Sequence, residues 1–147
     1  MRDDAGQLLL LVLLYALVAA GLVAVATGAA AVFLHRRALA SATDGAALAA
    51  VQGADEAAIY TGRADDELPI DPALARTIVS GYVADNRLAA RFPGFAVRSV
   101  AVDGRTVTVT FASLVRLPFV GVLGAEYEGG VPIDATARAR APFVAAP

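Results

Sequence analysis

Residues 5–34 have the sequence AGQLLLLVLLYALVAAGLVAVATGAAAVFL, a run without a charged side chain. As an α-helix rising about 1.5 Å per residue, this run is roughly 45 Å long, whereas the hydrocarbon core of a bilayer is roughly 30 Å thick. The eight leucines from Leu8 to Leu22 alone contribute about −4 kcal/mol to insertion, at roughly −0.5 kcal/mol each. The sequence therefore predicts a transmembrane helix that inserts without help from other helices.

The flanks of this run favour a permanent anchor over a cleaved signal. A secretory signal has a basic start and an apolar stretch of about 7 to 15 residues, whereas here two aspartates follow Arg2 and the apolar stretch is about twice too long. A-x-A triplets at 24–26 and 29–31 are expected in any alanine-rich segment. The run ends at a basic cluster of His35, Arg36 and Arg37. Because both flanks carry similar positive charge, the positive-inside rule alone leaves the orientation open.

Composition excludes several classes of function. The net charge is −2 and the charges are scattered, so no basic patch could neutralise a row of phosphates and we expect no nucleic-acid partner. The absence of cysteine excludes disulfides and thiolate sites.

The residues that could support catalysis do not form a site in the sequence. The single histidine, His35, suits an interfacial cation better than a general base, and the serines at 41, 80, 99 and 113 lack a histidine nearby in sequence. The acidic run 65–67 lacks the spacing of a calcium loop. We expect no enzyme activity, no cofactor, no metal and no small-molecule substrate.

Beyond Arg37 the chain is alanine-rich and free of proline, which predicts that the membrane helix continues into water to about Ala58. The predicted domains are a transmembrane helix with a helical extension (1–60), an acidic, proline-containing linker (61–70) and a small extracytoplasmic head (71–147). The extension is predicted to be a stalk that separates from the head at the linker.

The head is predicted to begin with a helix. Asp71 is an N-cap acceptor and Pro72 suits the first helical position, and Phe92-Pro93-Gly94 ends the helix after about Arg91. Its expected buried stripe consists of Leu74, Ile78 and Tyr82.

Three alternating runs follow this helix. Two of them flank Asp103-Gly104, a strong hairpin signal, although the inward side of 95–99 is ambiguous. In the second run Val107, Val109 and Phe111 share one face, and in the third the inward residues run from Val131 to Ala139. The segment 114–123 is apolar but too short and interrupted to cross a bilayer. The predicted fold class is α+β: a long N-terminal transmembrane helix extended as a stalk, followed by one helix packed on a three-stranded antiparallel sheet.

Small residues recur at every fourth position of the long helix. They are Ala16, Ala20, Ala24 and Gly28 in the membrane part, and Ala42, Ala46, Ala50, Ala54 and Ala58 in the extension. Such a stripe lets helices approach closely, which is a main source of helix association in lipid. The alternative is that an alanine-rich composition produces the stripe by chance, so a partner helix remains one of two interpretations.

Three short motifs in order carry a family resemblance: Asp4-Ala5-Gly6-Gln7 before the apolar helix, Phe33-Leu34-His35-Arg36-Arg37 at its exit, and Asp44-Gly45-Ala46-Ala47-Leu48-Ala49 beyond. Together they resemble the N-terminal signature of TadE/TadG-like Flp pilus-assembly proteins, over about residues 3–52. The resemblance implies a membrane-anchored accessory or minor-pilin-like structural component of a tight-adherence (Flp, type IVb-like) pilus or secretion apparatus. Its partners would be the membrane and other pilus or secretion-platform proteins, contacted through the transmembrane helix.

The resemblance also implies a single-pass protein of the cell membrane, with a cytoplasmic N-terminus and an extracytoplasmic head. Prepilin-type members carry a glutamate soon after the cleavage-site glycine, whereas here none occurs between Gly6 and Glu56. A retained anchor is therefore expected rather than a major pilin. The alternative function is a single-span membrane sensor or regulator whose small outer domain binds a ligand.

Overall fold

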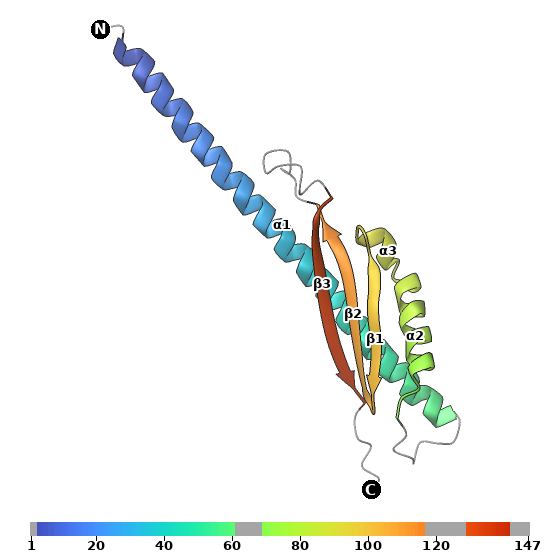
Figure 1. The fold of residues 1–147 in the computed structure, drawn as a ribbon. Helices are drawn as coiled ribbons and strands as arrows, with labels where there is room; N and C mark the ends of the chain where they lie inside the picture. The colour runs from blue at the N-terminus through green and yellow to red at the C-terminus, as the bar shows by residue number, and fades with distance from the viewer. Residues whose placement is uncertain (1–2, 61–68, 117–128, 142–147) are drawn as a thin grey trace.

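The computed structural model describes residues 3–60, 69–116 and 129–141. The elements in chain order are α1 (Asp3–Tyr60), α2 (Pro72–Asp85), α3 (Leu88–Arg91), β1 (Ala96–Asp103), β2 (Thr106–Val115) and β3 (Val131–Arg140) (Figure 1). The predicted fold class is confirmed: a long apolar N-terminal helix precedes a head in which a helix packs on a three-stranded antiparallel sheet. Most of the predicted linker (61–68) and the 117–123 part of the apolar segment lie outside the described residues.

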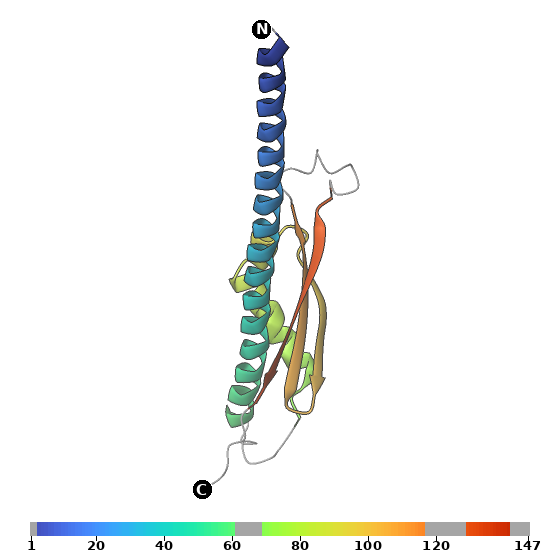
Figure 2. The same cartoon turned by 90° about the vertical axis from the view of Figure 1, so that its left-hand side faces the viewer.

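Helix α1 has two halves with different surroundings. Its N-terminal half extends beyond the head, and its C-terminal half lies alongside the sheet (Figures 1 and 2). The leucines of the first half are about half to three-quarters exposed, from 47% at Leu11 to 73% at Leu9, whereas Leu39 in the second half is fully buried. α1 is long and apolar enough to cross a membrane, which is consistent with an anchor.

The sheet has the order β1-β2-β3, with antiparallel pairing throughout. Asp103 pairs with Thr106 across the predicted turn, where Gly104 takes a positive φ of 56° that suits glycine. Inward and outward positions alternate as predicted from Thr106 to Phe111 in β2 and along β3, whereas Ala112 in β2 is buried as well. A register shift between Val97 and Ser99 interrupts β1, which explains why its first residues showed no clear period of two.

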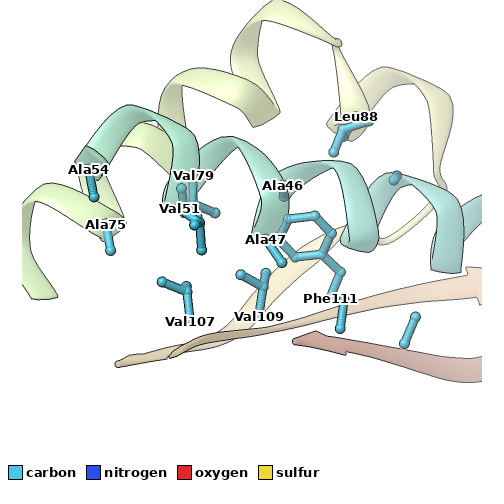
Figure 3. Close-up of a cluster of buried hydrophobic side chains, with 14 of the residues drawn as sticks. Ala46, Ala47, Val51, Ala54, Ala75, Val79, Leu88, Val107, Val109 and Phe111 are labelled. Carbon is cyan, nitrogen blue, oxygen red and sulfur yellow. The ribbon is translucent and has the colours of Figure 1, made fainter. Parts of the chain in front are cut away.

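The second half of α1 differs from the prediction, because it belongs to the core of the head and is not a separate stalk. Its small residues Ala46, Ala47 and Ala50 are at most 1% exposed. Figure 3 shows Ala46, Ala47 and Val51 of α1 above Val107, Val109 and Phe111 of β2. The sheet has one apolar face that must be covered, and α2 lies mainly beside α1 and over β1. The alanines of α1 let the helix backbone approach β2 and β3 closely, and α1 thereby covers the apolar face of these two strands.

Helix α2 begins as predicted, with the side chain of Asp71 accepting from the Ala73 N–H at 2.8 Å. It ends earlier than predicted, at Asp85, because Arg87 adopts a left-handed φ of 49° and starts the short α3. The Asn86 side chain donates to the Tyr82 carbonyl at 2.9 Å and stabilises this break.

The buried stripe of α2 is shifted by one position from the prediction. Ala75 and Val79 are the fully buried residues, while Leu74, Ile78 and Tyr82 are half-buried. Two glycines of α1 receive the larger side chains: a Cβ on Gly45 would overlap the Tyr82 hydroxyl, and one on Gly53 would lie 2.8 Å from Ile78 Cδ1. These glycines therefore set how closely α1 and α2 can pack.

The packing of α1 predicts that the head cannot fold without it. A fragment of residues 69–147 lacks the face of α1 that covers Val107, Val109 and Phe111 and therefore exposes these three residues. Circular dichroism of this fragment should show no cooperative thermal transition. A matched fragment of residues 35–147 keeps the buried half of α1 and should melt cooperatively. Cooperative melting of the shorter fragment would show that α1 is dispensable to the core.

Candidate functional site

The exposed apolar half of α1 is the largest unusual surface among the described residues. Residues 6–23 are exposed all round, which a helix in water avoids and a helix in lipid does not. From Ala24 onward one face becomes half-buried, at Ala24, Gly28, Ala31, Val32 and His35, and this face continues into the core at Leu39. Because α1 runs without a break from Asp3 to Tyr60, this surface is held in a fixed direction by the head.

The predicted helix-packing candidates fall on both sides of Ala24, the residue at which one face of α1 becomes half-buried. Ala16 and Ala20 are exposed, whereas Ala24 and Gly28 are half-buried within the chain. Further along, Ala42, Ala46, Ala50 and Ala54 are buried in the head's own core. The stripe therefore packs largely inside this chain, and Ala16 and Ala20 are the members that remain open to a neighbour.

The point where α1 meets the head is tied by a chain of hydrogen bonds. Nε2 of His35 lies 2.9 Å from Oγ of Ser113, and that hydroxyl donates to the Pro93 carbonyl at 2.9 Å. A hydroxyl has one proton, so His35 Nε2–H is the donor in the first bond. The Leu114 N–H donates to the same Pro93 carbonyl at 2.8 Å. The helix exit, β2 and the loop after α3 are thereby joined at one place.

Aromatic rings surround the same junction. The His35 ring meets the Phe92 ring edge-on, with centroids 5.3 Å apart, and Phe92 is 3% exposed. Phe95 lies 6.4 Å from Phe92 and 5.1 Å from Phe111, which joins the junction to the centre of the core. In the predicted basic cluster, Arg36 and Arg37 are exposed, whereas His35 turns toward the head and acts as a packing residue.

Sequence reasoning missed the pairing of His35 with Ser113. Ser113 is 2% exposed and its proton is directed to a carbonyl, so it is not placed as a nucleophile and His35 does not act as its base. The pair is a structural link. The one sequence signal is that Ser113 occupies an inward position of β2, where a polar side chain requires a partner. Nothing in the sequence indicates that this partner lies on α1.

The residues of the family motif fall into two groups. Gly6, Gln7, Asp44 and Leu48 are exposed, while Ala46 and Ala47 are buried and Ala49 is half-buried. The third motif thus contributes the helix face that touches the sheet, with its polar and larger members pointing away from the sheet. Its small residues have a packing role that the sequence alone did not reveal.

Comparisons of the chain with known protein families, with curated proteins and with solved structures find no match. The architecture therefore defines the class: one continuous helix whose first half presents an apolar surface, consistent with a membrane anchor, and whose second half is the central element of an α+β head.

The junction predicts a measurable coupling between α1 and β2. Ser113→Ala should lower the free energy of unfolding by about 1 kcal/mol, since it removes the acceptor of the His35 N–H. His35→Phe keeps a ring against Phe92 but loses the hydrogen-bond donor. The free energy of unfolding of the double variant should therefore fall by less than the sum of the decreases in the two single variants. Chemical unfolding of all four proteins in detergent measures this difference, which should be about 0.5 to 1.5 kcal/mol. Strict additivity would contradict the link.

Proposed function

We propose that the protein is a membrane-anchored accessory or minor-pilin-like structural component of a tight-adherence (Flp, type IVb-like) pilus or secretion apparatus. It would lie in the cell membrane with its N-terminus in the cytoplasm and its head outside. The observation that carries this proposal is that the motifs of the TadE/TadG-like resemblance coincide with the apolar half of α1, its exit and its contact with the sheet. The resemblance therefore rests on the elements that build this architecture.

The exposed surface supports a structural role. Covering one leucine side chain is worth about 1.5 to 3 kcal/mol, so the leucines between Leu8 and Leu22 strongly favour lipid or neighbouring helices over water. Because the same helix is central to the head, a neighbour that packs on the apolar half also fixes where the head points. A component that positions other subunits benefits from such a rigid connection.

The surface proposed for a neighbouring helix is the part of the small-residue stripe that the chain does not cover itself. Ala16 and Ala20 lie one turn apart on one side of α1 and are exposed. Small side chains allow close helix contact in lipid, where van der Waals packing is a main attraction between helices. We therefore assign contacts with pilus or platform proteins to this side.

This assignment predicts a loss of association in the double variant Ala16→Leu/Ala20→Leu. The added side chains would keep a neighbouring helix away, and co-purification with pilus or platform proteins from solubilised membranes should fall at least several-fold. Ala29→Leu adds one leucine on the opposite, exposed side of α1 and should leave recovery unchanged. Equal recovery with the double variant would reject the proposed contact.

The proposed orientation has an independent test, since the chain contains no cysteine. Ala101→Cys introduces a thiol at an exposed position of β1. A membrane-impermeant maleimide should label it in intact spheroplasts to the same extent as in lysed cells. Labelling only after lysis would place the head in the cytoplasm.

A further inference from the structure

We propose that the end of the head nearest the apolar half of α1 binds the phosphates of anionic phospholipids through Arg36, Arg37, Arg91 and Arg116, here termed the proximal arginines. This inference rests on the membrane anchor in the proposed function and does not depend on the pilus role. It adds a second contact with the bilayer, made by the head and not by the anchor.

The length of the uncharged run places these arginines at headgroup depth. Residues 5–34 form about 45 Å of helix, close to the roughly 40 to 45 Å thickness of a bilayer that includes both headgroup layers. With the two ends of the run at the two membrane surfaces, His35 lies at the outer edge of one headgroup layer. The tie from His35 to Ser113 and Phe92 leaves no free stalk between bilayer and head.

The fold brings the four arginines to this level from three elements. Arg36 and Arg37 directly follow His35 on α1. The Arg91 guanidinium lies 5.5 Å from the centre of the Phe92 ring, and that ring contacts His35. Arg116 follows the last residue of β2, about 10 Å along the strand from Ser113. All four side chains are exposed, and Figure 1 shows α3 and the end of β2 at the end of the head from which α1 emerges.

Charged residues of both signs lie at the other end of the head. Glu56, Asp71 and Asp103 are exposed there, at the end of α1, the start of α2 and the β1–β2 turn, and Arg105 and Arg140 lie in the same turn and at the end of β3. Asp85 and Arg87, at the turn between α2 and α3, offset each other. Arg98 pairs with Asp134 at 4.0 Å, and among the described residues no carboxylate lies within ion-pair distance of a proximal arginine.

Arginine suits phosphate because its planar guanidinium donates two parallel hydrogen bonds to one phosphate group. Each basic residue near an anionic surface favours binding by about fivefold at physiological salt. The stacking of Arg91 on Phe92 also limits the positions that its side chain can adopt. Four such residues around one helix exit would orient the head on the membrane and enrich anionic lipid there.

The test uses the full chain in lipid nanodiscs with a fluorophore on Ala89→Cys, an exposed position of α3. The quencher is attached to the headgroup of either phosphatidylglycerol or phosphatidylcholine. Quenching by the anionic lipid should exceed quenching by the neutral lipid several-fold, and high salt should reduce the excess. In Arg91→Gln/Arg116→Gln the excess should fall most of the way to equal quenching by the two lipids, because each arginine removed weakens binding to the anionic surface by about fivefold.

The matched control is Arg76→Gln/Arg138→Gln, which removes two exposed arginines from α2 and the outer face of β3 and should preserve the excess. Equal quenching by the two lipids, or an equal loss in the control, would overturn the inference while leaving the anchor intact. A chain that fails to enter nanodiscs would instead overturn the anchor, and this inference with it. Co-purification with pilus proteins bears on neither result.

Discussion

The structure depends on one face of α1 covering one face of a sheet. β2 directs Val107, Val109 and Phe111 to a single side, and the opposing residues of α1 are mostly alanines, with Leu39 and Val51 between them. Small side chains bring the helix close, and the larger residues of the strands fill the space that remains. A sheet of three strands has little core of its own, so the helix is part of the head and not an attachment to it.

Because that helix continues unbroken into its apolar half, the anchor and the head behave as one body. A flexible stalk would let the head sample many orientations above a membrane, whereas here one face of the uncharged run is already half-buried, at Ala24, Gly28, Ala31 and Val32. The His35–Ser113–Pro93 hydrogen bonds fix the same junction from the side of the sheet. Whatever covers the first half of α1 therefore also determines the direction of the head.

Local signals predicted the elements, and the relation between distant elements was harder to predict. The Asp71 cap, the Asp103-Gly104 turn and the alternation from Thr106 to Phe111 act over a few residues, and each is found as predicted. The predicted end of α2, at about Arg91, was wrong because Arg87, a non-glycine residue, adopts a left-handed conformation that no local pattern indicates. The alanine stripe was compatible with a partner helix or with composition alone, and its periodicity did not indicate that Ala42 to Ala54 pack on the chain's own sheet. For the same reason the sequence did not identify His35 as the partner of Ser113.

The packing also changes what the family resemblance can mean. If Ala46 and Ala47 were part of a partner-binding surface, they would have to be accessible, yet both are buried against the chain's own sheet. The small residues of the third motif are then part of the packing of this fold, since Ala46 and Ala47 let α1 lie close to the sheet. The contact with a neighbouring helix proposed above therefore uses the open side at Ala16 and Ala20 and not the third motif. A resemblance confined to residues 3–52 thus supports a shared way of building an anchored head more directly than it supports a shared partner.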